Sequence, residues 1–190
     1  MYGAKAPSYI LRMTGQFTYR LANQADLPVL RQLLDLSIRE LIGRYFEDLR
    51  VKASLEIMGL DTELITDRTY YVVESERQVV GCGGWSRRAT MFGGDHTPGR
   101  DARLLDPEVE PARVRAMYTH PDFVRRGIGR LVLEQCEIAA AREGFSAVEL
   151  VATVAGEPFY LSAGFNIIER FEVPTTLGVS VPCARMAKAL

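Results

Sequence analysis

Residues 120–130 read His-Pro-Asp-Phe-Val-Arg-Arg-Gly-Ile-Gly-Arg, and they connect a β-rich segment to the clearest helical pattern of the chain. A glycine-rich turn that leads into a helix leaves several backbone N–H groups unpaired, and the helix dipole adds positive potential there. Gly127 and Gly129 let an anion approach the backbone without an obstructing Cβ. Full positive charges come from three arginines, Arg125, Arg126 and Arg130. The stretch therefore predicts a binding site for a diphosphate.

Two other kinds of phosphate loop do not fit this stretch. A dinucleotide fingerprint requires Gly-x-Gly-x-x-Gly, and Val132 stands at its third glycine position. A Walker loop requires a Gly-Lys-Ser/Thr ending, which the stretch lacks. A bare Gly-x-Gly is also found at ordinary helix starts with solvated arginines, so the interpretation depends on the arginines and on the strand–loop–helix context.

Regular elements are predicted on both sides of this loop. After it, a helix over residues 128–142 carries Leu131, Val132 and Ile138 on one side and ends before Gly144. An apolar strand (148–152), a short helix (157–163) and two strands (167–173 and 179–186) complete the chain. Before it, the predicted order is a strand (17–21), two helices (27–42 and 47–58), a hairpin (69–74 with 79–85), a long exposed loop (89–111) and a strand (113–119).

This order predicts an α/β protein with a mixed, mostly antiparallel twisted sheet flanked by helices. The strand–helix–strand unit over residues 113–152 requires parallel pairing with a right-handed crossover, whereas the hairpin before it is antiparallel. The sequence contains no internal repeat and no linker to a second domain. We therefore expect a flexible leader at residues 1–16 and a single domain at residues 17–190.

The composition excludes several classes of protein. Hydrophobic residues make up 47%, charged residues 25%, and the net charge is -1, which is ordinary for a soluble globular protein. This balance disfavours nucleic acid as a partner, and no apolar run is long enough to span a membrane. Three widely spaced cysteines predict neither a disulfide framework nor a zinc site, so we expect no metal and a cytoplasmic location with reduced thiols.

Two motifs resemble the GNAT superfamily of N-acetyltransferases. The loop is similar to the family's Arg/Gln-x-x-Gly-x-Gly/Ala motif: Gly127 and Gly129 match, while Val124 departs from the first position. The stretch from Phe159 to Phe165, Phe-Tyr-Leu-Ser-Ala-Gly-Phe, looks like the family's Tyr-x-x-x-Gly-Phe signature. The resemblance implies a GNAT-like sheet with a strand–loop–helix acyl-CoA site, and direct transfer of an acetyl group from acetyl-CoA to a primary amine.

The resemblance also implies roles for individual residues. Backbone groups of Met117, Tyr118 and Thr119 are expected to pair with the pantetheine arm of the cofactor. The pyrophosphate is expected to lie on the loop, at Arg125, Arg126, Gly127, Ile128, Gly129 and Arg130. Tyr160 is expected to donate a proton or a hydrogen bond to the departing thiolate, because a phenol is protonated at neutral pH.

The sequence leaves the proton acceptor unassigned. Arg113 stands where many family members place a carboxylate, so Glu40, Glu110 and His120 are weak candidates for a base. Residues Glu40, Tyr45 and Glu47 lie in the region that lines the acceptor pocket in the family.

The acceptor can be a small molecule or a peptide, and the sequence does not decide between them. A homodimer is also compatible with the sequence. A non-catalytic acyl-CoA-binding regulatory module is the alternative function, with a nucleotide-binding regulator as a third option.

Overall fold

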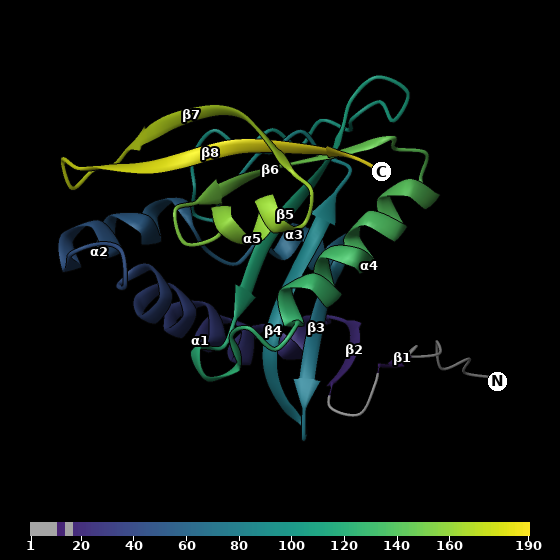
Figure 1. The fold of residues 1–190 in the computed structure, drawn as a ribbon, viewed down its shortest axis with the longest axis horizontal. Coiled ribbons are helices and arrows are strands. Elements are labelled where there is room, and N and C mark those ends of the chain that lie inside the picture. Colours follow the sequence, from purple (N-terminus) through teal and green to yellow (C-terminus); the bar gives the residue numbers. More distant parts are fainter. Residues whose placement is uncertain (1–10, 14–16) are drawn as a thin grey trace.

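The computed structural model describes residues 11–13 and 17–190 (Figure 1). They form an eight-stranded sheet in the order β1-β2-β3-β4-β5-β6-β8-β7. The strands are β1 (Leu11–Met13), β2 (Phe17–Leu21), β3 (Tyr70–Ser75), β4 (Gln78–Ser86), β5 (Ala112–Thr119), β6 (Ala147–Thr153), β7 (Asn166–Pro174) and β8 (Ser180–Ala189). The helices are α1 (Leu27–Ser37), α2 (Asp48–Ile57), α3 (Thr62–Thr66), α4 (Ile128–Arg142) and α5 (Glu157–Ser162).

This architecture confirms the predicted fold class. All neighbouring strands pair antiparallel except β5 and β6, which are parallel and connected through α4. Short 3₁₀ turns lie at Gln24–Asp26 and Pro121–Phe123. In the part of the chain that the structure describes, none of the helices combines the length and the apolar character that a membrane crossing requires.

Three features differ from the predicted elements. The helix expected over residues 27–42 is an α-helix only to Ser37 and continues as a π-helix over Ile38–Ile42. The short helix α3 was not predicted. Of the expected leader, Leu11–Met13 form strand β1 beside β2, and the rest lies outside the described residues.

Helices cover both faces of the sheet. Apolar side chains of α1, including Leu30 and Leu34, form one buried cluster with Tyr70 and Val72 of β3. Those of α4, including Val132, form another cluster with residues from the opposite face. Because side chains alternate across a strand, β3, β4 and β5 each contribute to both clusters.

Two glycines of β4 let α4 approach the sheet closely. A Cβ at Gly81 would lie 2.2 Å from Cγ2 of Ile128, the first residue of α4. A Cβ at Gly83 would lie 2.4 Å from Sδ of Met117 in β5 and 2.9 Å from Cγ1 of Val132 in α4. These positions therefore fix where α4 begins relative to β5.

The long loop before β5 is held against the domain, and the expectation of a wholly exposed loop was wrong. Thr90, Thr97 and Leu105 are buried. Arg100 donates a 2.7 Å hydrogen bond to Asp61, a carboxylate with no exposed surface that also pairs with Arg115 of β5 at 2.6 Å. Glycines and prolines indicated the lack of regular structure in this loop, but long-range ion pairs decide its packing.

A buried carboxylate ties β5, β6 and β8 together. Glu149 of β6 is 2% exposed and forms ion pairs with Arg113 of β5 and Arg185 of β8. Arg113 and Glu149 are also register partners in the parallel ladder. The Arg113 side chain is 10% exposed and that of Arg185 is 45% exposed, so the two partners of Glu149 differ in burial.

We predict that Glu149→Ala destabilises the fold by about 3–5 kcal/mol, because it leaves the buried Arg113 guanidinium without a counter-charge. The control Arg185→Gln removes a half-exposed partner of the same carboxylate and is expected to cost at most about 1 kcal/mol. Urea unfolding of both variants measures the difference. Equal losses in the free energy of unfolding would show that the Arg113–Glu149 pair is no more important for stability than the half-exposed Arg185 partner.

Candidate active site

The parallel pairing of β5 with β6 ends soon after it begins. The ladder joins Ala112 to Val148 and Arg113 to Glu149, and no later residue of β5 pairs with β6. Beyond this point β5 contains a bulge, since its pairing with β4 skips Gly83 and Ala116 has a left-handed φ of 51°. The two strands therefore diverge and leave a gap at their carboxyl ends.

The side chain of a buried tyrosine, Tyr70, stabilises the bulge through a hydrogen bond. The Tyr70 hydroxyl donates a 2.9 Å hydrogen bond to the carbonyl of Ala116 and lies 3.2 Å from Sγ of Cys82. Tyr70 has no exposed surface, so this carbonyl has a partner where the strand no longer provides one.

Beyond the bulge, β5 presents a free backbone edge to the gap. The His120 amide donates to the Val80 carbonyl of β4, and backbone groups alternate between the two edges of a strand. The groups of Met117 and Thr119 therefore face away from β4, toward the side that β6 has left. Those of Tyr118 face β4, and its side chain reaches Gly59, whose amide donates to the phenol oxygen at 3.0 Å.

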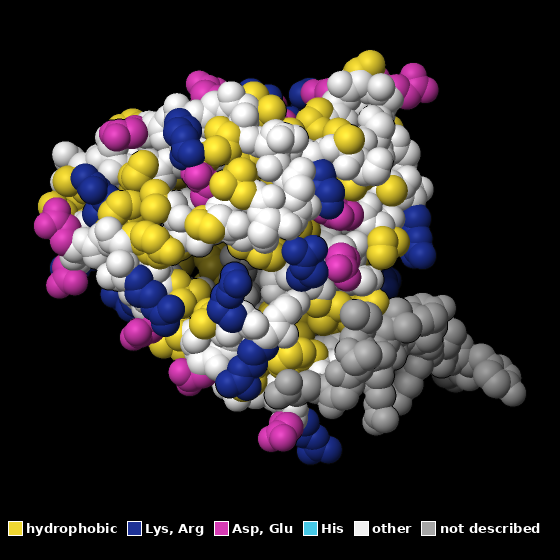
Figure 2. Space-filling view, viewed as in Figure 1, with side chains coloured by type: hydrophobic (Ala, Val, Ile, Leu, Met, Phe, Trp, Pro, Cys, Tyr) yellow, Lys and Arg dark blue, Asp and Glu magenta, His cyan; other side chains and the backbone are white. Residues whose placement is uncertain are grey.

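A cleft of about 560 Å³ opens at this gap. We call it the outer cleft. Its walls come mainly from residues between 117 and 130, between 153 and 162, and between 37 and 45. Figure 2 shows a hollow on this face with hydrophobic side chains inside it and lysine or arginine side chains around it. The cleft thus combines an apolar interior with a basic rim.

Eight of the nine residues predicted to bind a cofactor line the outer cleft: Met117, Tyr118, Thr119, Arg125, Gly127, Ile128, Gly129 and Arg130. Arg126 is the exception, because its guanidinium carbon stacks 4.9 Å from the Phe123 ring centroid. The structure thus brings the predicted set together around one opening.

The glycine loop leaves its amides free. The first backbone bond of α4 runs from the Leu131 amide to the Gly127 carbonyl. None of the amides of residues 124–130 donates to another residue that the structure describes. Left-handed φ angles of 63° at Arg125 and 87° at Gly127 turn the chain into the helix. This arrangement of free amides at a helix start suits an anion.

Tyr160 lies where the outer cleft meets a second cavity. Its ring packs between Phe159 and Phe165, with centroids 5.0 and 5.6 Å away. A Cβ at Gly156 would lie 3.2 Å from the ring, so this glycine permits its position. Among the described residues the hydroxyl has no hydrogen-bond partner, and burial raises the pKa of the phenol above its usual value. Tyr160 therefore offers a protonated, unengaged hydroxyl to the cleft.

The second cavity, which we call the inner pocket, has a volume of about 120 Å³. It is lined by residues 57–59, 91–93, 114–118 and 151–153, together with Gly156, Tyr160 and Cys183. Residues common to both cavities form the junction: Met58, Met117, Tyr118, Thr153, Gly156 and Tyr160. A molecule in the outer cleft and one in the inner pocket would therefore meet beside Tyr160.

None of the weak candidates for a base lines either cavity. The Arg103 guanidinium donates hydrogen bonds to Glu110 and lowers the pKa of that carboxyl to about 2. Glu40 and His120 lie outside both linings. Arg113, at the position where the family often has a carboxylate, is paired with Glu149.

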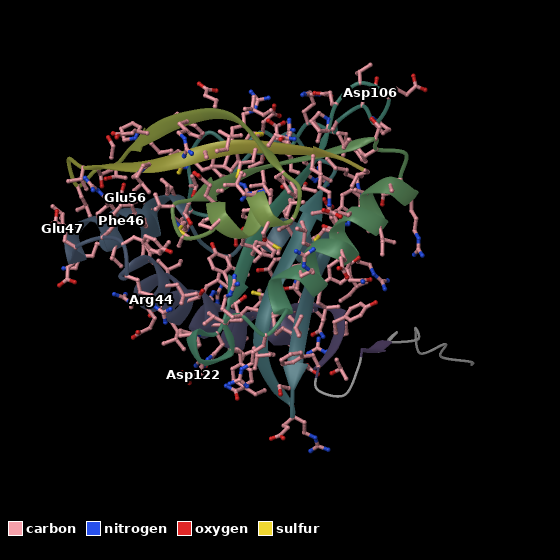
Figure 3. The ribbon with its side chains drawn as sticks, viewed as in Figure 1. Arg44, Phe46, Glu47, Glu56, Asp106 and Asp122 are labelled. Atoms are coloured by element: carbon pink, nitrogen blue, oxygen red, sulfur yellow. The ribbon has the colours of Figure 1, made fainter. Side chains whose placement is uncertain are left out.

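Sequence reasoning missed Arg44 and Thr153, which both line the outer cleft. Figure 3 shows Arg44 in the segment between α1 and α2, and Arg44 and Tyr45 both line the outer cleft. They follow the π-helix, a feature often found at functional sites. Of the three residues expected near an acceptor, Tyr45 lines the cleft, whereas Glu40 and Glu47 do not. Thr153 could have been found, since it ends a strand parallel to β5 and ligands gather at such carboxyl ends.

The comparisons with known proteins agree with this geometry. Residues 66–167 match a family model described as an acetyltransferase (GNAT) domain. The comparison with curated proteins gave no match. A GCN5-related N-acetyltransferase structure from Rhodopseudomonas palustris shares 17% identity, with coverage of 95% of this chain and 99% of that one, at a TM-score of 0.69.

Two other similar structures were solved with a coenzyme. An N-acetyltransferase from Thermoplasma acidophilum in complex with coenzyme A shares 12% identity, with coverage of 93% and 100% and a TM-score of 0.62. A putative acetyltransferase from Salmonella typhimurium with acetyl-CoA shares 17% identity, with coverage of 93% and 95% and a TM-score of 0.62. At these identities the likeness establishes the fold.

We predict that Tyr70→Phe lowers the free energy of unfolding by about 1–3 kcal/mol, because the Ala116 carbonyl loses its partner in a buried site. Tyr71→Phe is the matched control, since the Tyr71 hydroxyl has no hydrogen-bond partner among the described residues, and it is expected to change stability by less than about 0.5 kcal/mol. Urea denaturation compares the two. A loss at Tyr71 equal to that at Tyr70 would show that the bulge does not depend on this bond.

Proposed function

Because the chain belongs to the GNAT acetyltransferase family, we propose that it moves the acetyl group of acetyl-CoA directly to a primary amine at the junction of its two cavities. The observation that carries the proposal is the gap between β5 and β6, which joins the free amides of the glycine loop to the hydroxyl of Tyr160. The structures solved with coenzyme A and acetyl-CoA support an acyl-CoA in this gap.

In this proposal the glycine loop binds the pyrophosphate. Free amides of residues 124–130 and the positive end of the α4 dipole face the anion. Arg125 and Arg130 line the cleft and add full charges. Arg126 also raises the local potential, but its stacking on Phe123 keeps it out of the lining. The loop therefore acts mainly through its backbone, which explains why Val124 is acceptable at the position where the family motif has Arg or Gln.

The pantetheine arm pairs with the free edge of β5. Met117 and Thr119 offer backbone groups on the edge that β6 has left, so an extended chain can add there like a further strand. Tyr118 takes part through its ring rather than through its backbone. This path leads the thioester from the glycine loop to the junction beside Tyr160.

The chemistry at the junction is an acyl transfer between two bound substrates. The amine nitrogen attacks the thioester carbonyl carbon, negative charge builds on the carbonyl oxygen, and the C–S bond then breaks. The Tyr160 hydroxyl donates to the departing sulfur. Because burial raises its pKa, Tyr160 is in the protonated form throughout the neutral range.

An acyl-cysteine intermediate does not fit the thiols of this chain. Cys82 lines the outer cleft, but it is 1% exposed, and burial raises the pKa of its thiol to about 12. Burial also raises the pKa of Cys183 to about 11. A thiol attacks as the thiolate, so both groups are inert at neutral pH. Transfer therefore goes directly from the cofactor to the amine.

One observation favours the alternative of a non-catalytic acyl-CoA-binding module. In the described part of the chain, no carboxylate or histidine lines either cavity, so an ammonium acceptor has no base. Turnover with a chemically competent amine distinguishes an enzyme from such a module.

We predict that acetyl-CoA binds with micromolar affinity or better, about -8 kcal/mol, and that Gly129→Asp weakens it at least about 100-fold. A carboxylate at this helix start opposes the phosphate charge. Gly129→Asn is the matched control, because its side chain has the same shape and meets the same Phe159 ring, 3.3 Å from the Cβ position. Calorimetry is the measurement. Wild-type affinity in both variants would show that the pyrophosphate does not bind at this loop.

We predict that Tyr160→Phe slows transfer by about 10²-fold and leaves the affinity for acetyl-CoA nearly unchanged, since the lost hydroxyl acts on the leaving thiolate. Release of coenzyme A thiol measures the rate, and calorimetry measures the affinity. Thermal unfolding serves as the control, because a ring between Phe159 and Phe165 also supports packing. Unchanged turnover by a folded variant would make Tyr160 a structural residue only.

A further inference from the structure

The inner pocket has the size and walls of a site for a compact apolar group. Its lining includes Ile57 at the end of α2, Met58 directly after it, Met91 and Phe92 from the loop before β5, and Val151 of β6. Its volume of about 120 Å³ is a little smaller than the roughly 150 Å³ of an engineered apolar cavity that holds benzene. A branched aliphatic or a single aromatic group therefore fits.

The charged side chains among the described residues that line the two cavities are all positive. Among the described residues, all the charged side chains that line either cavity are arginines, namely Arg44, Arg115, Arg125 and Arg130. Arg115, in the wall of the inner pocket, is 4% exposed and is engaged by Asp61 at 2.6 Å and by the Gly93 carbonyl at 2.7 Å. A group that enters the inner pocket therefore meets apolar side chains and a guanidinium already neutralised by Asp61, and among the described lining residues it meets no carboxylate.

The lining of the inner pocket favours the neutral form of an amine over its protonated form. An ammonium ion would lose its hydration in the pocket without gaining a carboxylate, which costs several kcal/mol. A neutral amine avoids this desolvation cost.

Building on the proposed function, we infer that the acceptor is a weakly basic primary amine on a compact apolar group, and that it enters the inner pocket as the free base. An α-amino group beside an apolar side chain and an arylamine share this chemistry. Lysine side chains and polyamines do not.

The proton balance of the reaction then closes within the site. The lone pair of the neutral amine forms the C–N bond, and the C–S bond breaks with its electron pair on sulfur. Tyr160 gives its proton to that sulfur, and the proton lost from nitrogen restores the phenol. The products are the amide and the free thiol of coenzyme A, so no separate base is required. A protonated amine would first have to release one more proton to solvent.

Two amines with the same branched group test this inference. Leucinamide carries an α-amino group, with a pKa near 7.7, and isopentylamine carries an alkylamine, with a pKa near 10.4. At pH 7.4 about a third of the first and about one part in a thousand of the second are neutral, a ratio of about 300. We expect kcat/KM for leucinamide to exceed that for isopentylamine by about 300-fold at pH 7.4. At pH 9.4 the gap should shrink to about tenfold, and effects on the enzyme cancel in the ratio.

A substitution in the pocket wall provides a second test. Met91→Glu places a carboxylate where it can hold an ammonium ion and accept its proton, and Met91→Gln is the neutral control of the same shape. We expect the Glu variant to lower the preference for leucinamide at least about tenfold relative to the Gln variant. If both variants fold and show the same preference for leucinamide, the pocket does not select amines by their protonation state, and the inference is wrong. If neither folds, the wild-type comparison decides alone.

Four further amines show which class of acceptor reacts, and they distinguish a failure of this inference from a failure of the proposed function. p-Toluidine represents a small arylamine, amidated Leu-Ala-Ala a peptide end, and Nα-acetyl-lysinamide and spermidine the basic amines. A preference for isopentylamine or either basic amine at pH 7.4 overturns the inference and leaves the proposed transferase intact. If acetyl-CoA binds but no amine reacts, the inference falls and the cofactor site stands. If acetyl-CoA does not bind, the proposed function fails as well.

Discussion

The candidate site depends on the early end of the β5–β6 ladder. Arg113 and Glu149 are paired both in register and as a buried ion pair, which closes the two strands at one end. Beyond them the bulge at Ala116 turns β5 away, and the Tyr70 hydroxyl satisfies the carbonyl that the bulge releases. Strands β5 and β6 are therefore paired at one end and separated at the other, which produces a V-shaped gap within an otherwise continuous sheet. Both cavities open from that gap.

Close packing around the gap positions the chemical groups. Gly81 lets Ile128 approach β4, so the first turn of α4 and its free amides lie at the mouth of the gap. Gly156 allows the Tyr160 ring to lie between two phenylalanines at the junction of the cavities. The ion pair between Asp61 and Arg115 holds the wall of the inner pocket. Each of these contacts joins segments that are distant in sequence, so the site is a product of the whole fold.

The sequence predicted the features that local chemistry determines. The glycine loop, the helix over residues 128–142 and the motif around Tyr160 each contain their signals within a few residues, and the structure brings these three together. The bulge at Ala116 and the π-helix after α1 could not be predicted, because long-range packing stabilises them. The same holds for the loop expected to be exposed, whose burial depends on Asp61. Arg44 was missed because no local pattern distinguishes it from a solvated arginine.

Amide hydrogen exchange with and without acetyl-CoA tests the central claim most directly, namely that the gap between β5 and β6 holds the cofactor. If the cofactor binds there, exchange slows at residues 124–130 and at Met117 and Thr119, because their free N–H groups gain partners. The outer strand β7, on the far side of β8, should exchange at an unchanged rate. Protection confined to other segments, with the glycine loop unaffected, would contradict the account.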